Sequence, residues 1–407
     1  MPTLPSGTLL AAEPAWPMPV PPDGRYPRVA VLGLRGVPAT WGGVERQCEE
    51  LYTRLAAVGF PITIYCRAPY VPRDLTTYRG LRLVRLPAPS GKHAEAFFHT
   101  LLASLHVAGQ ACDIVHVYSQ GPALFLPLLR LVKPRARLFF TCGGLDWQRG
   151  KWSGQASRII RLGEWCSARF VDTRIMVSQA LVDSYRERYG VESCYIPNGV
   201  TLQSVRPLGK LAELGLTPRG YALFVGRLVP EKRIEDLIAA TVAAQSDLKL
   251  VIAGGTAGCE DYAASLRAAA GTSGRVVLAG YRFGDELAAL FANARLYVTA
   301  SALEGLPLSL LEGMAAGLPC LASDIAPHRE VLAGTGCYFP VGDREALTAG
   351  LEAAANEAEA FLAARGAVCR DRALAAFGWD KAAANLAQAY LGLGCDHGAP
   401  ERAPTSE

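Results

Sequence analysis

Short apolar segments alternate with longer helical segments along most of this chain, and the pattern forms two separate series. The segments of the first series are 29–34, 61–66, 81–86, 113–118, 137–141 and 173–178, and those of the second are 221–226, 248–253, 275–279, 295–300, 319–323 and 336–339. Strands that are almost wholly apolar and separated by helices form parallel sheets covered on both faces. The length of 407 residues suits two domains of about 200 residues each. The sequence therefore predicts an α/β protein of two doubly wound, Rossmann-like domains.

The expected domain boundaries follow from these two series. A turn signal at Tyr195–Val200 closes the first series, and a polar, irregular stretch continues from it to about Gly220. The expected parts are a disordered Pro-rich segment at 1–27, a first domain at 28–200, a linker at 201–219, a second domain at 220–376, a terminal helix at 377–393 and a disordered tail at 394–407. Parallel sheets bind ligands beyond the carboxyl ends of their strands, so two such domains predict a site in a central cleft between them.

The composition of the chain and the spacing of its cysteines and histidines argue against several classes of protein. The formal net charge of +4 is far from the dense positive field of a nucleic-acid binder, so no nucleic-acid partner is expected. The 11 cysteines are scattered without a C-x-x-C pair, so we expect reduced, mostly buried thiols in a cytoplasmic protein. The histidines are not clustered at metal-ligand spacing, so no metal site is expected. The longest apolar run, Ala123–Leu129, is too short to span a membrane, and the early prolines argue against a signal peptide.

A glycine-rich turn follows the first apolar segment. Gly33–Gly36 lies at its end, and then Gly42 and Gly43 precede a helical segment that contains Glu45. Paired glycines let a phosphate or a sugar approach the backbone, and a helix N-terminus attracts anions. The same residues suit a plain tight turn before a helix, so the sequence leaves both interpretations open.

Two basic residues follow the first strand of the second series. Arg227 and Lys232 lie five residues apart, in the segment Gly226–Arg233, at the expected carboxyl end of that strand. An arginine fork and a lysine point charge can hold a diphosphate from two directions. The pattern therefore favours phosphate binding over an ordinary exposed loop.

Two glutamates accompany an apolar helical segment later in the second domain. Pro307 suits the first turn of this helix, whose other residues are so apolar that we expect it to be buried on all sides. Glu312 is its only charge, and Glu304 lies eight residues earlier in the preceding loop. A buried carboxylate needs hydrogen-bond donors, which the hydroxyls of a sugar or a ribose can provide. The alternative is a structural glutamate paired with an arginine or a backbone amide.

Taken together, these motifs resemble the retaining GT-B glycosyltransferases of family 4, also called glycosyl transferases group 1. The resemblance extends from residue 28 to about residue 392 and is carried by Gly42-Gly43-x-Glu45, Asn198-Gly199-Val200, Gly226-Arg227 with Glu231-Lys232, and Glu304-x7-Glu312. The segments 34–38, 144–149 and 151–152 resemble a bacterial branch that is associated with rhamnosyl or other sugar transfer in polysaccharide assembly. The implied fold is GT-B, with two Rossmann-like domains facing a central cleft.

The resemblance implies an enzyme that moves a sugar from a nucleotide-diphosphate donor to a glycan or a polyprenyl-diphosphate-linked acceptor in cell-surface polysaccharide (exopolysaccharide) synthesis. It implies that Arg227 and Lys232 hold the donor diphosphate and that Glu312 bonds the ribose. The other donor-binding positions that it implies are Gly42, Gly43, Glu304, Gly305, Leu306 and Leu308. The terminal helix is expected to cross back to the first domain. A sugar-nucleotide epimerase on the same architecture and a non-catalytic nucleotide-sugar-binding protein remain as alternatives.

No D-x-D triplet occurs in the chain, so the metal clamp of the other large glycosyltransferase fold is missing. We expect no cofactor and no obligatory metal ion, because Arg227, Lys232 and helix N-termini can meet the charge of the leaving diphosphate. The family implies front-face attack, in which the departing phosphate helps to take the acceptor proton.

The first domain departs from the family at one position. Many relatives have a histidine in the loop after the strand that matches 137–141, whereas this chain reads Thr-Cys-Gly-Gly-Leu-Asp. Asp146 is the nearest candidate catalytic residue there, or else a helix cap. From Trp147 to Phe170, five basic residues and three tryptophans accompany one acid, Glu164. This stretch fits a lipid-linked diphosphate acceptor and peripheral contact with the inner face of the plasma membrane, or a solvated helix face over core tryptophans.

Overall fold

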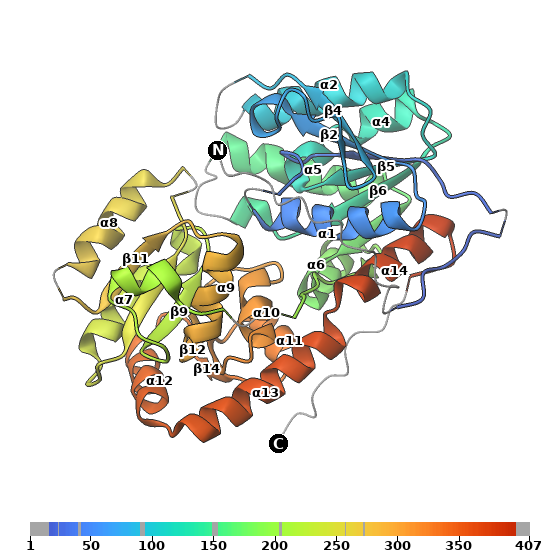
Figure 1. Cartoon of the computed structure of the whole chain (residues 1–407). Helices are drawn as coiled ribbons and strands as arrows, with labels where there is room; N and C mark the ends of the chain where they lie inside the picture. The colour runs from blue at the N-terminus through green and yellow to red at the C-terminus, as the bar shows by residue number, and fades with distance from the viewer. Residues whose placement is uncertain are drawn as a thin grey trace.

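Figure 1 shows a computed structural model of the chain, in which two α/β domains lie side by side. The structure describes residues 16–22, 24–39, 42–89, 94–148, 154–202, 206–256, 258–271 and 273–395. Each domain is built on one sheet of mainly parallel strands, so the two-domain α/β architecture expected from the alternating apolar segments is confirmed.

The sheet of the first domain has the strand order β3-β4-β2-β1-β5-β6-β7-β8. Its strands are β1 Val29–Leu32, β2 Ile62–Arg67, β3 Thr77–Tyr78, β4 Leu81–Leu86, β5 Ile114–Tyr118, β6 Arg137–Cys142, β7 Thr173–Met176 and β8 Cys194–Tyr195. In the centre, Val29 of β1 lies opposite Ile62 of β2 on one side and Ile114 of β5 on the other. The chain reverses its direction of progress across the sheet at β1, which is where open α/β sheets bind ligands.

Helices cover both faces of this first sheet. They are α1 Gly43–Ala57, α2 Ala94–Ala108, α3 Gln120–Ala123, α4 Leu126–Val132, α5 Gln155–Arg169 and α6 Gln179–Tyr189, with short 3-10 helices η1 Ala68–Tyr70 and η2 Asp146–Gln148. In α1, the residues Cys48, Leu51, Tyr52 and Leu55 repeat at helical spacing, and all of them are buried in one core cluster with β1 and β2.

The sheet of the second domain has the order β11-β10-β9-β12-β13-β14, with parallel pairing throughout its described strands. Its strands are β9 Tyr221–Val225, β10 Lys249–Ala253, β11 Val276–Gly280, β12 Leu296–Thr299, β13 Cys320–Ser323 and β14 Cys337–Phe339. The helices are η3 Gly209–Leu214, η4 Pro230–Lys232, α7 Ile234–Ala243, α8 Glu260–Ala270, α9 Gly284–Asn293, α10 Leu308–Ala315, α11 Ala326–Leu332, α12 Arg344–Asn356, α13 Glu359–Ala376 and α14 Trp379–Leu391. The reversal point of this sheet lies between β9 and β12.

The last helix, α14, lies against the first domain and not against the second (Figure 1). Asp380 accepts a hydrogen bond of 2.6 Å from Arg54 of α1, and the hydroxyls of Tyr390 and Tyr52 are 3.1 Å apart. At the start of α14, a side chain on Gly199 would come within 2.7 Å of Trp379 backbone atoms, so the glycine allows the two segments to meet.

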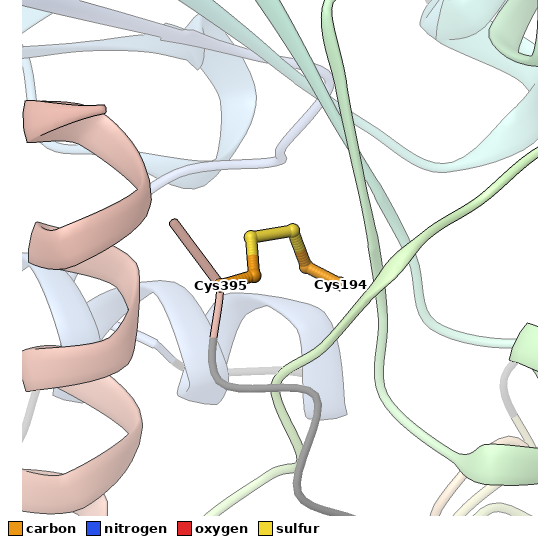
Figure 2. The surroundings of a disulfide bond; sticks show 2 residues. All are labelled: Cys194 and Cys395. Carbon is orange, nitrogen blue, oxygen red and sulfur yellow. A yellow bond between two sulfur atoms is a disulfide. The ribbon is translucent and has the colours of Figure 1, made fainter. Parts of the chain in front are cut away.

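A disulfide bond fixes the segment after α14 to the first domain. Figure 2 shows Cys395 bonded to Cys194 of β8, with a Cα–Cα distance of 5.5 Å and a sequence separation of 201. The expectation that all the cysteines are reduced is therefore wrong for this pair. Its physical reason is the return of α14, which brings together two cysteines whose spacing in sequence carries no signal. The tail expected to be disordered is held at Cys395, and 396–407 lie outside the described residues.

Part of the expected N-terminal disordered segment is also placed against the first domain. The ring of Tyr26 lies 4.3 Å from that of Phe60, and the Lys381 ammonium lies 5.6 Å from the Trp16 ring. Residues 1–15 lie outside the described residues. Within the part of the chain that the structure describes, no helix combines the length and the apolar character that a membrane crossing needs.

Candidate active site

Two loops at the carboxyl ends of β9 and β12 are joined to one another. The backbone N–H of Ala302 donates to the carbonyl of Glu231 at 2.9 Å, and the Lys232 ammonium forms an ion pair with the Glu304 carboxylate. The side chains of Lys232 and Glu304 are only 13% and 11% exposed. The sequence assigned these two residues to a diphosphate and to a sugar, and the structure brings them into direct contact at the reversal point of the sheet.

Glu304 is held as a carboxylate by its neighbours. Burial by itself would raise the pKa of Glu304, but Lys232, His328 and a hydrogen bond from Ser301 together lower it below its ordinary value. His328 is fully buried, and burial lowers its pKa, while the Glu304 carboxylate acts in the opposite direction. Its Nδ1 atom lies 2.7 Å from the carbonyl oxygen of Ser323, while Nε2 has no hydrogen-bond partner among the described residues.

Sequence reasoning missed His328 as a neighbour of the site. A usable signal was present, because this polar residue lies in the first turn of α11, which follows the apolar strand β13, and therefore lies at the same edge of the sheet as Glu304.

Arg227 lies on the loop that also carries Lys232. The N–H of Gly226 donates to the carbonyl of Ala253 at 3.0 Å, and the N–H of Leu228 donates to that of Gly255 at 2.9 Å. These two bonds fix the backbone on both sides of Arg227 to the neighbouring loop after β10. The half-buried Arg227 is thus positioned by a rigid scaffold.

Glu312 lies on α10 and faces the first domain. Burial raises the pKa of Glu312 to about 7, while Arg46 lowers it and Glu50 raises it. Arg46 and Glu50 belong to α1 and form an ion pair of 2.8 Å. Glu312 is therefore a carboxyl group at the junction of the two domains, whose charged form would be stabilised by further hydrogen-bond donors.

Helix α10 is less completely buried than expected. Leu310, Leu311 and Met314 are fully buried, but Leu308 and Glu312 are half-buried. The reason is that one side of the helix faces the first domain and not the core of its own. Pro307 is the residue directly before the helix.

Glycines allow the two domains to approach closely around the site. A side chain on Gly305 would overlap the carbonyl group of Gly143, and one on Gly43 would lie 3.1 Å from Leu308. Gly42 has a φ of +98°, which disfavours any residue with a side chain. The structure therefore brings Gly42 and Gly43 of the first domain to the N-terminus of α10.

The segment between Gly305 and Leu308 is also held from the first domain. The side-chain amide of Asn198 donates to the carbonyl oxygen of Leu306 at 3.2 Å, and Leu306 is buried. Gly305, Leu306 and Leu308, which were predicted to bind the donor, thus form one wall of the junction.

Asp146 lies in η2, two residues after Gly144, whose backbone lies beside Gly305. The N–H of Asp146 donates to the side chain of Gln120 at 2.9 Å, and Gln120 in turn donates to Glu164 at 2.8 Å. Asp146 is thus placed near the junction but on a different loop from Glu304.

Glu164 organises the loop that follows β6. This carboxylate is fully buried and accepts hydrogen bonds from Trp147 at 2.6 Å and Tyr189 at 2.9 Å, and it pairs with Arg188 at 2.6 Å. Trp147 is therefore a half-buried, structural tryptophan. Arg149, Lys151 and Trp152, which the sequence grouped with it, lie outside the described residues.

The structure has two parallel-sheet domains that meet at this site, with a basic and an acidic loop at the strand ends of the second domain. These features define a glycosyltransferase of the GT-B fold. The chain belongs to the group 1 and family 4 glycosyltransferases. The family model for glycosyl transferases group 1 matches residues 219–357, and the model for glycosyltransferase family 4 matches residues 41–204.

Two curated relatives are glycosyltransferases, and the chain matches one over about half of its length and the other over most of its length. The chain is 29% identical to O-antigen chain mannosyltransferase B of Escherichia coli over 197 residues, which is 47% of this chain and 47% of that protein. It is 27% identical to α-maltose-1-phosphate synthase of Mycobacterium tuberculosis over 383 residues, covering 86% of this chain and 96% of that protein.

Solved structures share the fold. Sucrose-phosphate synthase from Thermosynechococcus elongatus superposes with a TM-score of 0.79 at 24% identity, covering 91% of this chain and 99% of that one. HepE from Anabaena in complex with UDP-glucose superposes with a TM-score of 0.74 at 17% identity, covering 89% of this chain and 99% of that one.

Proposed function

We propose that this protein is a retaining glycosyltransferase that moves a sugar from a nucleotide-diphosphate donor to a hydroxyl group of a glycan or a polyprenyl-diphosphate-linked acceptor. We place this reaction in cell-surface polysaccharide synthesis, on the cytoplasmic side of the plasma membrane. The relatedness to an O-antigen chain mannosyltransferase supports that role.

The observation that carries the proposal is the ion pair between Lys232 and Glu304 at the joined ends of β9 and β12. Without a donor, each group neutralises the other. A diphosphate would compete for the Lys232 ammonium, because charge-assisted hydrogen bonds to phosphate are strong. Glu304 would then be free to accept hydrogen bonds from the hydroxyls of the donor sugar.

The remaining donor contacts follow from the same geometry. Arg227 would hold the diphosphate from the fixed loop after β9, and Glu312 would accept hydrogen bonds from the ribose hydroxyls. Backbone N–H groups of Gly305, Leu306 and Leu308 would face the sugar. Gly42 and Gly43 would let the phosphate approach the N-terminus of α1.

In the proposed reaction, the bond between the anomeric carbon and the diphosphate oxygen breaks. The acceptor oxygen forms the new bond on the same face of the sugar, and its proton passes to the leaving diphosphate. Arg227 and Lys232 stabilise the developing negative charge, so the step needs no metal ion. Asp146 would orient the acceptor from the first domain.

A panel of nucleotide sugars tests the donor site by thermal shift. UDP-glucose, GDP-mannose and a dTDP-rhamnose donor cover the sugars suggested by relatives and by the sequence. The true donor should raise the melting temperature of the parent, because a ligand that binds the folded state stabilises it. We expect this shift to be lost in Lys232→Ala and kept in Lys210→Ala, where the lysine is exposed and lies on η3.

Transfer of radiolabelled sugar with the donor found in this way tests the reaction itself. We expect turnover that persists in EDTA, with the anomeric configuration of the donor kept in the product. Donor binding without turnover for any glycan or lipid-linked acceptor, or a product of inverted configuration, would refute the proposal.

A further inference from the structure

Exposed apolar side chains are concentrated on three adjacent helices of the first domain. Helix α2 packs against α4, and α4 packs against α5, so the three helices form one continuous surface. These helices make up less than a tenth of the chain but carry eight of the nineteen large apolar side chains that are exposed in its described part. The eight are Phe97, Phe98, Leu102 and Leu105 of α2, Leu131 of α4, and Ile159, Leu162 and Trp165 of α5.

These side chains are not a poorly packed core, because each helix already has a separate buried face. In α5, Ile160, Gly163 and Cys166 point inward, whereas Leu162 and Trp165 remain 49% and 45% exposed. In α2, Ala103 and Val107 are fully buried, so its exposed residues lie on the opposite side of the helix. Isolated exposed apolar residues need no explanation, but a group of this size marks a contact surface.

The charges on this surface have one sign. On α5, the exposed charged residues Arg158, Arg161 and Arg169 are all basic, and the one acid, Glu164, is fully buried. Arg158, Leu162, Trp165 and Arg169 follow at spacings of four, three and four residues, so they form a single stripe along the helix with arginines at both ends.

Two acidic residues near this surface, Glu95 and Asp172, are each paired with an arginine, so neither offsets the charge of the α5 arginines. Glu95 of α2 pairs with Arg67 at 3.4 Å and accepts a hydrogen bond from Tyr70. Asp172, just after α5, pairs with Arg130 of α4 at 2.9 Å. The surface therefore presents apolar side chains and excess positive charge together.

We propose that the outer surface of α2, α4 and α5 binds the surface of a bilayer that contains anionic lipids. Phe, Leu and Trp side chains would enter the boundary between headgroups and acyl chains, and the arginines would contact the phosphates. The proposal does not depend on which sugar or acceptor the enzyme uses. It gives the enzyme a fixed orientation in which α1 and α14 lie on the other side of the sheet, away from the bilayer (Figure 1).

The pattern favours a bilayer over a protein partner. Protein interfaces bury a closely packed apolar core that is depleted of charge and surrounded by a polar rim. Here Arg158 and Arg169 lie one turn from the apolar residues Leu162 and Trp165 on the same stripe of α5. Side chains of this kind can enter a fluid headgroup region one by one, and the single sign of charge complements an anionic membrane.

Flotation of the full-length protein with vesicles tests the proposal. One set of vesicles is phosphatidylcholine alone, and the other is an equal mixture of phosphatidylcholine and phosphatidylglycerol. Neither set contains donor or polyprenyl lipid, so the result is independent of the proposed transfer reaction. We expect binding to the mixed vesicles that weakens with salt, and little binding to phosphatidylcholine.

Two pairs of variants separate the apolar from the electrostatic contribution. Arg158→Gln/Arg169→Gln should lower partitioning about 25-fold, since each arginine near an anionic surface contributes about fivefold. Leu162→Ser should lower it about tenfold through lost apolar burial. The matched controls, Arg267→Gln/Arg370→Gln and Phe361→Ser, change exposed residues on α8 and α13 and should bind like the parent.

The proposal is overturned if the parent fails to float with the mixed vesicles, or if the α5 variants float as well as the parent. It is also overturned if the parent self-associates through this surface without binding vesicles, which sedimentation velocity of the parent and of Leu162→Ser would reveal. Circular dichroism of each variant verifies the fold.

Discussion

At the scale of single residues, the two glutamates of the site differ in their protonation. Glu304 lies beside Lys232, and the net effect of its surroundings is a lowered pKa. Glu312 has a pKa raised to about 7, because burial outweighs the favourable effect of Arg46. Glu304 is therefore charged throughout the neutral range, whereas Glu312 changes charge within it.

The raised pKa of Glu312 makes stability depend on pH. Its ordinary value is 4.5, so between pH 4.5 and about 7 the folded protein binds a proton that the unfolded chain has lost. The contribution of this proton to the free energy of unfolding is fully present below pH 4.5 and is lost as the pH rises through about 7. We expect Glu312→Gln to match the parent in acid and to exceed its free energy of unfolding by up to about 3 kcal/mol at alkaline pH.

Urea denaturation across this pH range measures the difference. Glu345→Gln, which changes an exposed glutamate, is the control and should follow the parent at every pH. Parallel curves for the parent and Glu312→Gln would show that burial does not disfavour the charged carboxylate. The same charge change should make donor affinity rise as the pH passes through about 7 in the parent alone.

At the scale of elements, the loop before α10 depends on a close backbone contact. A side chain at Gly305 would overlap the Gly143 carbonyl, so Gly305→Ala must push apart two loops that belong to different domains. We expect Gly305→Ala to cost about 1–3 kcal/mol of stability and to weaken donor binding. Gly121→Ala, at a glycine with open space around it, should change neither quantity. If Gly305→Ala and Gly121→Ala show equal melting temperatures and equal shifts on adding the donor, this prediction is contradicted.

The disulfide fixes the end of the α14 segment to β8. Cross-linking residues 201 apart restricts the unfolded chain, so Cys194→Ser should lower the free energy of unfolding by about 2–5 kcal/mol. Cys337→Ser removes an exposed free thiol and serves as the control. A reducing agent should lower the unfolding midpoint of the parent and of Cys337→Ser, and leave Cys194→Ser unchanged. If the reducing agent shifts the unfolding midpoints of the parent and of both variants equally, the disulfide bond contributes nothing to stability.

At the scale of the whole molecule, the sequence predicts both sheets because nearly continuous apolar strands produce a strong pattern. The two-residue strands β3 and β8 were missed, since Thr77–Tyr78 and Cys194–Tyr195 are too short to carry a period. The sequence also grouped Lys232 with Glu304 in one site, because both follow strands of the same sheet.

Other features depend on contacts between distant segments. One example is the bond between Cys194 and Cys395, and another is the approach of Arg46 to Glu312. In both cases the residues are far apart in the sequence, so local sequence patterns do not predict that they meet. Glu164 is a similar case, because its role depends on Gln120 and Arg188 in separate elements. Spacing along the sequence predicts which residues lie at strand ends. It does not predict which residues are brought into contact when helices and domains pack together.

The most direct test of the donor site is a crystal structure of the enzyme with the nucleotide sugar that raises its melting temperature. We expect the diphosphate within hydrogen-bond distance of Arg227 and Lys232, the ribose at Glu312, and the sugar at Glu304, which no longer pairs with Lys232. A nucleotide bound away from the junction of the two domains, or a diphosphate held by other side chains while Lys232 and Glu304 stay paired, would contradict this.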